Sequence, residues 1–203
     1  MKARTMNAFA LLPRTSRRQL LAAALVAAGT ASLPAGSAWA QAGAKGGAAN
    51  LAMIGEPQSL DPMVSSTDLV GTIMQHVFEP LYTFDAQWSI KPMLAEGMPT
   101  ISADGLTYTI ALRKGVKFHS DKDMTADDVV ASLQRWMDVS ARGKAVGQEI
   151  ASMTAKNANT VEIKLKAVYA PLLAHLAMPS GMAGIMPKES VAPVLKDFIG
   201  TGP

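Results

Sequence analysis

Apolar residues recur at helical spacing in several parts of the chain. After Asp68 they fall three and four positions apart until Pro80, which cannot continue a helix. The same spacing returns over residues 126–137, and the run APLLAHLAMP has Pro171 near its first helical position. A last helical piece is predicted in SVAPVLKDF, residues 190–198. The pattern therefore predicts two longer amphipathic helices and two shorter helical pieces.

Strands are predicted where apolar and polar residues alternate, or where a short apolar run ends at Gly or Pro. Residues 152–165, SMTAKNANTVEIKL, have a hairpin pattern with a turn at residues 157–159. The other predicted short strands cover residues 51–57, 81–85, 88–92, 107–112 and 116–118. No sequence period of about 20 to 50 residues recurs, so the chain is not a repeat array.

Charge is distributed unevenly along the 203 residues. The first 40 residues contain five of the 19 Lys and Arg residues and none of the 16 Asp and Glu residues. The net charge of +3 therefore comes from this leader, and the slightly acidic remainder gives no case for a nucleic-acid partner. Cysteine is absent, which excludes disulfides, thiolate nucleophiles and sulfur-ligated zinc.

The leader has the features of a cleavable export signal. A basic front precedes an Ala/Leu-rich stretch, and the small-residue pattern A-W-A ends it. We predict a signal peptide over residues 1–40 with cleavage near Ala40, then a flexible mature N-terminus over residues 41–50. The pair Arg17 and Arg18 favours the twin-arginine type, with a general secretory signal as the alternative. A membrane anchor is the less favoured interpretation of the leader, because an anchor would need about 20 apolar residues without interruption.

The stretch HSDKDMTADD, residues 119–128, concentrates titratable side chains. As a calcium loop it lacks both the glycine and the bidentate glutamate at the diagnostic positions. As a zinc site it offers one histidine, His119, with no second histidine at a paired spacing. A capping box made by Thr125 and Asp128 at a helix start explains more of these residues than a metal site or a metal-dependent hydrolase does.

Motifs of the common enzyme classes do not occur in the sequence. There is no G-x-S-x-G pattern, and ARGKAVG, residues 141–147, lacks the upstream glycine of a phosphate-binding loop. We predict that the protein is not an enzyme and requires no cofactor and no metal.

The chain contains, in order, the segments EPQSLDP, FEPLYTFD, IKPMLAE, SADGLTYTIALRKGVKFHSDKDMTADDVVASLQR, NANTVEIKLKAVYAPLLAHLA and IGTGP. In this order they resemble the peptide/nickel-type (family 5) extracytoplasmic solute-binding proteins of ABC importers. The resemblance implies an α/β, periplasmic-binding-protein-like fold of the bilobed type II. Residues 51–203 would form the N-terminal part of lobe I with its extra subdomain. Because family members are much longer, we expect this chain to be an N-terminal fragment.

The resemblance also implies a function. The protein would be a monomer that captures a small solute in the periplasm, by default a di- or oligopeptide, as its lobes close. It would deliver the solute to membrane permease subunits driven by a cytoplasmic ATPase. Within the same fold the solute could instead be a nickel chelate, an opine, glutathione or a sugar. A ligand sensor that docks a membrane receptor is a further alternative.

Site residues follow from the resemblance at one place only. In peptide-binding relatives the loop after the S-L-D-P turn lines the ligand cleft, and the equivalent residues here are Ser66, Thr67 and Asp68. Asp68 would meet a cation of the ligand, and the hydroxyls would hydrogen-bond a peptide backbone. The same residue types are also preferred at the start of a helix, so capping is an equally open interpretation.

Overall fold

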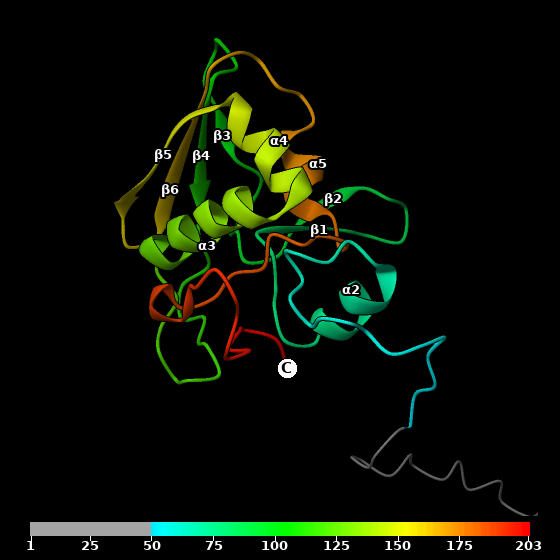
Figure 1. Cartoon of the computed structure of the whole chain (residues 1–203). Helices are drawn as coiled ribbons and strands as arrows, with labels where there is room; N and C mark the ends of the chain where they lie inside the picture. Colours follow the sequence, from blue (N-terminus) through cyan, green and yellow to red (C-terminus); the bar gives the residue numbers. More distant parts are fainter. Residues whose placement is uncertain (1–49) are drawn as a thin grey trace, which may run out of the picture. The chain divides into compact units, whose positions relative to one another are not determined.

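A four-stranded antiparallel sheet in the order β3-β4-β6-β5 is the larger of the two sheets in the described part (Figure 1). Its strands are β3 (Thr100–Ile101), β4 (Thr107–Ala111), β5 (Ile150–Asn157) and β6 (Thr160–Leu165). A second, two-stranded sheet pairs β1 (Tyr82–Phe84) with β2 (Ile90–Pro92). This computed structural model describes residues 50–203, so the predicted signal peptide and residues 41–49 of the predicted tail lie outside it.

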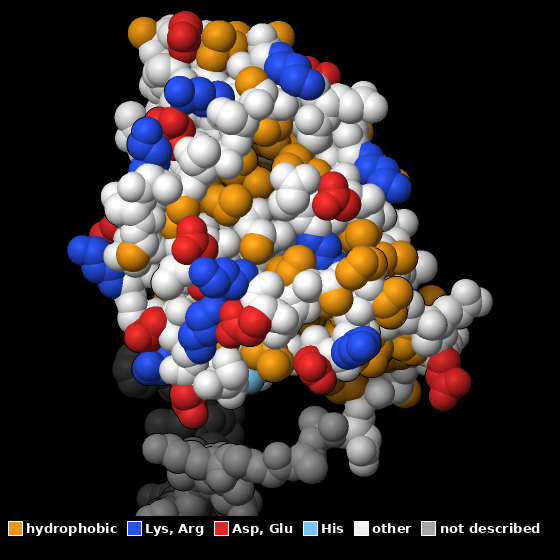
Figure 2. Space-filling view, turned by 60° about the vertical axis from the view of Figure 1, so that its left-hand side comes forward, with side chains coloured by type: hydrophobic (Ala, Val, Ile, Leu, Met, Phe, Trp, Pro, Cys, Tyr) orange, Lys and Arg blue, Asp and Glu red, His pale blue; other side chains and the backbone are white. Residues whose placement is uncertain are grey.

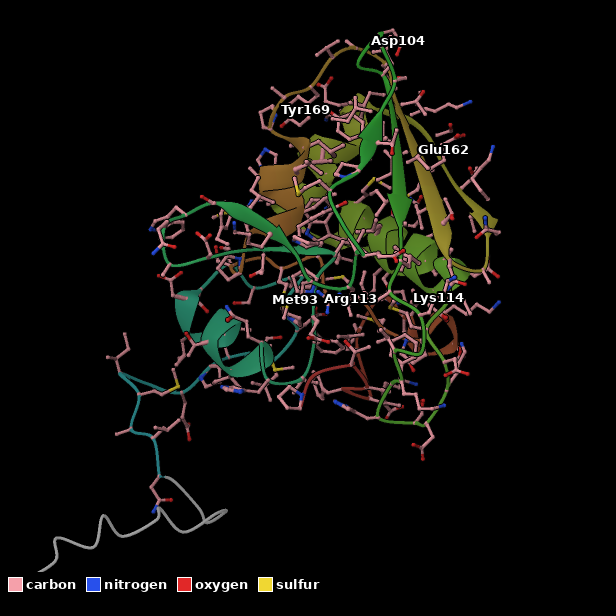
Figure 3. The ribbon with its side chains drawn as sticks, turned by 180° about the vertical axis from the view of Figure 1, so that it is seen from behind. Met93, Asp104, Arg113, Lys114, Glu162 and Tyr169 are labelled. Atoms are coloured by element: carbon pink, nitrogen blue, oxygen red, sulfur yellow. The ribbon has the colours of Figure 1, made fainter. Side chains whose placement is uncertain are left out.

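Two helices cover one face of the larger sheet. They are α3 (Ala126–Val139) and α4 (Ala141–Glu149), and α3 contacts both β5 and β6 (Figure 1). Along β4, Tyr108 and Ile110 are buried, whereas Thr107 and Thr109 are partly buried and Ala111 is exposed. The strands lie in front of the helices in the reverse view, where Glu162 marks β6 (Figure 3). This alternation is typical of a sheet with one packed and one solvated face.

The remaining helices are short. They are α2 (Asp68–Met74), α5 (Leu172–Ala177) and a 3₁₀ turn, η1 (Lys188–Ser190). Helix α5 contacts both β1 and β2. Helices are therefore confirmed at three of the four predicted places, as are the strands in the 81–92 region, the strand at residues 107–111 and the hairpin.

Three local predictions are wrong. Residues 51–57 form no strand, because they find no partner strand in the described part, and Leu51 and Ile54 are 81% and 103% exposed. Residues 116–118 form only an isolated bridge from Lys117 to Asp123 as the chain folds back on itself. Residues 190–198 form no helix beyond the end of η1.

The failure at residues 190–198 has a specific cause. Pro193 supplies no N–H, and the Arg135 side chain binds the carbonyls before and at this proline. Arg135 Nε donates to Ala192 O at 2.5 Å, and Nη2 donates to Pro193 O at 3.3 Å. Helical hydrogen bonds are thereby replaced by bonds to a side chain.

Helix α4 is an element that the sequence pattern did not predict, because its two glycines are poor helix formers. Both glycines are explained by close packing against α3. A Cβ on Gly143 would lie 2.0 Å from Trp136 O, and one on Gly147 would lie 3.3 Å from Met137 Sδ. Tertiary contact therefore decides the conformation of this segment.

The stretch at residues 119–128 forms the start of α3, as its capping-box pattern predicts. Asp128 Oδ2 accepts the Thr125 N–H at 2.9 Å and closes the capping box of α3. The Lys122 Nζ and the Lys188 N–H donate to Asp128 Oδ1 at 2.8 and 2.9 Å. Burial raises the pKa of Asp128, but these hydrogen bonds together outweigh it and leave the pKa below its ordinary value.

Candidate solute-binding site

The predicted site residues lie at the start of α2. Thr67 takes the N-cap position and Asp68 is the first helical residue, but the Thr67 side chain makes no capping hydrogen bond. Its hydroxyl instead lies 3.0 Å from the Ser65 hydroxyl. Ser66, Thr67 and Asp68 are all exposed, and Asp68 forms no ion pair within residues 50–203. The capping interpretation is therefore right about position and wrong about the hydrogen bond.

Two of these three residues line a groove of about 650 Å³. Thr67 and Asp68 form one wall, together with Ser65 and Leu69, and residues 54 and 56–59 complete the lining. Ser66 is not part of the lining. The groove offers two carboxylates, those of Glu56 and Asp68, with hydroxyl and amide groups between them, and its lining contains no Lys or Arg. It can accept a cationic or hydrogen-bonding group of a small solute.

A second turn of the chain packs directly behind α2. A Cβ on Gly71 would lie 3.0 Å from Pro179 O and 3.7 Å from Ser180 Cα, so a larger residue would push this turn away by a few tenths of an ångström. Trp136 Nε1 donates to Gly181 O at 2.9 Å, which fixes the same turn to α3. Gly181 has φ of 62°, a conformation that residues with a side chain rarely adopt.

Arg142, in the first turn of α4, completes this region. Its Nη1 donates to Ser180 O, and the guanidinium forms no ion pair within the described residues. Burial lowers the pKa of Arg142. The turn at Ser180 therefore lies between Arg142 and α2, the helix that begins at Asp68.

Tyr169, labelled in Figure 3, precedes α5, and His175 lies in the last turn of that helix. Their rings stack at 5.9 Å with an interplanar angle of 8°, and the Tyr169 hydroxyl lies 2.9 Å from His175 Nε2. Burial lowers the pKa of His175, and the positive charge of Arg142 lowers it further. The charge of Arg142 therefore acts on the His175 ring.

His119 is engaged by backbone groups at the end of the described chain. The Gly200 N–H donates to His119 Nδ1 at 3.3 Å, so Nε2 carries the proton and donates to Gly202 O at 2.8 Å. No group of three or more His, Asp or Glu side chains within residues 50–203 could hold a metal ion. Both ring nitrogens of His119 thus serve the fold.

Charge on the visible surface is mixed in sign. On the face in Figure 2, acidic and basic side chains lie side by side with apolar side chains between them. Such a surface does not provide the single-sign field that nucleic-acid binding requires. None of the helices in the described part is long and apolar enough to span a membrane.

Sequence reasoning missed Arg142 and the turn at Gly181. The only signal in the sequence was an arginine in a glycine-containing stretch, ARGKAVG, whose spacing does not fit a phosphate-binding loop. The contact with Ser180 joins residues 38 positions apart, and no local pattern reports such a pairing.

The chain is similar in sequence and in structure to known binding proteins. The chain is 32% identical over 151 residues to the glutathione-binding protein GsiB of Salmonella choleraesuis, an alignment that covers 71% of this chain and 29% of GsiB. The chain thus spans less than a third of that relative's length. It is similar to the periplasmic binding protein AgaA of A. tumefaciens R10, solved with agropinic acid, with a TM-score of 0.64 and 28% identity over 73% of this chain and 31% of AgaA.

DppA from Helicobacter pylori, an ABC transporter-associated periplasmic binding protein solved with the peptide STSA, is similar with a TM-score of 0.62. Identity to DppA is 28%, over 71% of this chain and 33% of DppA. Residues 89–203, more than half of the chain, match the family model described as bacterial extracellular solute-binding proteins, family 5 Middle. This match agrees with the mixed helix-and-sheet architecture, and the chain belongs to the family 5 extracellular solute-binding proteins.

Proposed function

We propose that this chain serves as the solute-binding component of an ABC importer and captures a small solute, by default a di- or oligopeptide, in the periplasm. Thr67 and Asp68 would contact the solute, with Ser66 beside them. The observation that carries the proposal is their exposed position in a groove of about 650 Å³ in a member of a solute-binding family. A cavity of this size suits a small ligand.

Asp68 supplies the chemical preference of the groove. Its carboxylate has no ion-pair partner within residues 50–203, and Glu56 adds a second negative charge to the same lining. The free ammonium group of a peptide is a suitable partner for such carboxylates. The relatives' ligands support this choice, because glutathione and the peptide STSA both carry an ammonium group.

Transport places the protein in a larger assembly. Membrane permease subunits with a cytoplasmic ATPase would receive the solute, and no bond of the solute would be broken. An exported chain with a twin-arginine signal cleaved near Ala40 fits this placement. A neighbouring permease gene would favour import over the sensor alternative.

The test is a nuclear magnetic resonance titration of the isotope-labelled chain with trialanine, glutathione, nickel-histidine and agropinic acid. We expect one of these solutes to shift the backbone amides of Ser66, Thr67 and Asp68 in a saturable way. Asp68→Asn should weaken binding by about tenfold, as the loss of one charge-assisted hydrogen bond implies. Asp138→Asn, which removes a carboxylate from α3 outside this groove, is the matched control.

Two results would contradict the proposal. One is the absence of any saturable shift at residues 66–68 with all four solutes. The other is an equal effect of Asp68→Asn and Asp138→Asn, since loss of net charge alone would then account for the weaker binding.

A further inference from the structure

Strand β5 is an outer strand of the larger sheet, and within the described residues only β6 pairs with it (Figure 1). The opposite edge of the sheet is β3, which is only two residues long. One side of β5 therefore presents backbone N–H and C=O groups that pair with no other strand of residues 50–203. Such a row of groups is a template for the addition of a further strand.

The middle of β5 lacks the features that usually prevent strand addition. Register shifts interrupt the pairing with β6 on both sides of residues 152–155, which form a regular run between them. This run, S-M-T-A, contains no proline and no charged residue. Proteins commonly protect an edge strand with bulges, lysines or prolines. Here the register shifts and Lys156 lie outside the run, which leaves it available to a further strand.

The two faces of β5 differ, and this difference restricts the strand that can be added. Met153 lies opposite the buried Ile163 of β6, on the side that α3 and α4 cover, whereas Thr154 lies opposite Glu162 on the other side. A second β5, related by a twofold axis perpendicular to the sheet, is antiparallel to the first and has its helices on the same side. The chain itself thus provides a strand of the required kind.

A groove of about 540 Å³ runs beside this edge. Residues of α3 and α4 line it together with Ile150–Met153 of β5. Met137 and Met153 are half-buried in this lining and give it apolar surface. Methionine side chains are flexible and polarizable, so they adapt well to the surface of a partner.

The groove also contains one acid and one base that do not pair with each other. Asp138 of α3 and Lys144 of α4 both line it, both are exposed, and neither forms an ion pair within residues 50–203. Asp138 accepts one hydrogen bond, which Gln134 Nε2 donates at 3.1 Å. A surface with one unpaired charge of each sign is complementary to itself, because a twofold axis brings the base of one copy to the acid of the other.

We propose that β5 and this groove form an interface between two copies of the chain, which pair through antiparallel β5 strands around a twofold axis. The two sheets join into one continuous sheet, and the methionines of both grooves come together on its helix side. Lys144 pairs with the partner's Asp138. This interface does not rest on the proposed function, and the dimer takes the place of the monomer that the family resemblance implies.

Sedimentation velocity of the 203-residue chain at increasing concentration measures the association. We expect a monomer–dimer equilibrium with a Kd on the order of 10–100 µM, as a small interface implies. The mass should rise from 21.3 kDa at about 1 µM toward twice this value at about 500 µM. A mass of 21.3 kDa at every concentration would overturn the proposal, and an extended peptide would then be the remaining candidate for the β5 edge.

Thr154→Lys tests the strand edge. It places a charge in the middle of the regular run, where the twofold axis brings it close to the same charge of the second copy, and should weaken dimerisation about tenfold. Thr109→Lys is the matched control, because Thr109 of β4 lies opposite the same Glu162 from the inner side of the sheet. The control should leave dimerisation unchanged. Equal weakening by the two variants would contradict the assignment to β5.

Asp138→Lys and Lys144→Glu test the charge pairs. Each variant alone brings like charges together in its own dimer, so each should dimerise about tenfold more weakly than the wild type. An equimolar mixture brings the two bases of the first variant to the two acids of the second and should restore the dimer. A mixture that dimerises no better than either variant alone would overturn the pairing of Lys144 with the partner's Asp138.

The outcomes also separate this interface from the proposed function. Asp138→Asn, the control of the solute titration, removes a charge from the interface and should weaken the dimer without changing the solute response of residues 66–68. Dimerisation that is lost in Thr154→Lys would support the interface even when no solute shifts residues 66–68. A saturable solute response in a chain that stays monomeric at every concentration would support solute binding and overturn the interface.

Discussion

The ion pair between Asp61 and Arg135 gives the sharpest stability prediction. Arg135 is 3% exposed, and its Nη1 and Nη2 groups bind the two carboxylate oxygens of Asp61, Nη1 at 3.2 Å. The same side chain binds two carbonyls of the segment at residues 192–193. Asp61→Asn keeps the shape of the side chain and removes its charge, so the buried cation of Arg135 loses its counter-charge.

The expected cost follows from the burial of the pair. Removing one partner of a buried ion pair typically costs about 3–5 kcal/mol, because the other charge stays buried without compensation. For a domain of this size each kcal/mol lowers the melting temperature by about 2–4 °C, so Asp61→Asn should lower it by roughly 6–20 °C. Asp61→Asn with Arg135→Met should recover part of this loss, since no unpaired charge then remains.

Urea denaturation followed by tryptophan fluorescence measures the change, with Trp136 next to Arg135 in α3 as a reporter. The control is Asp123→Asn, which breaks an ion pair with Lys117 whose side chains are 68% and 56% exposed. Exposed pairs contribute about 0.2–1 kcal/mol, so this variant should be close to wild type. A cost below about 1 kcal/mol for Asp61→Asn with an unchanged denaturant slope would refute the reasoning.

Three further predictions follow from the pKa shifts and from one tight contact. The pKa of Asp128 is lower in the folded protein than its ordinary value of 3.8, so the carboxylate stabilises the fold above pH 3.8 and this stabilisation is lost as the pH falls further. Asp128→Asn should therefore flatten the pH dependence of the unfolding free energy between about pH 5 and 2. A ring-proton titration should give His175 a pKa below 6.5, and its contribution to stability should be lost as the pH falls below 6.5. Arg142→Gln should raise the pKa of His175, and an unchanged pKa would contradict the assigned charge effect. Gly200→Ala places a Cβ 1.8 Å from a backbone oxygen and should cost about 1–3 kcal/mol in urea, whereas Gly97→Ala, which meets nothing within 4 Å, should cost less than about 0.5 kcal/mol.

Sequence patterns correctly predicted the elements that are stabilised by interactions between residues close in sequence. The capping box of Thr125 and Asp128, and the alternation along residues 160–165, each act between residues close in sequence, and the structure confirms both. The strand predicted at residues 51–57 has the right apolar character, but a strand needs a partner, and none lies beside it in the described part. Sequence character alone does not provide the hydrogen bonds.

The candidate site depends on contacts that no local pattern encodes. Arg135 reaches Asp61 across 74 positions, and Arg142 reaches Ser180 across 38. Gly143 reads as a helix breaker in the sequence, yet the structure uses it to bring α4 against α3. A glycine that disfavours a helix locally therefore indicates close packing of α4 against α3.

Helix α3 explains how one element can serve both stability and binding. Arg135 holds the loop at Asp61, the next residue, Trp136, holds the turn at Gly181, and Ser140 ends the helix next to that turn. The first contact lies behind the groove of Thr67 and Asp68, because the Asp61 O also accepts the N–H of Ser65 at 3.0 Å. The contact of Trp136 holds the turn that packs against Gly71 of α2. One rigid helix therefore supports both the loop before the groove and the turn behind α2, so a substitution in α3 should disturb both places together.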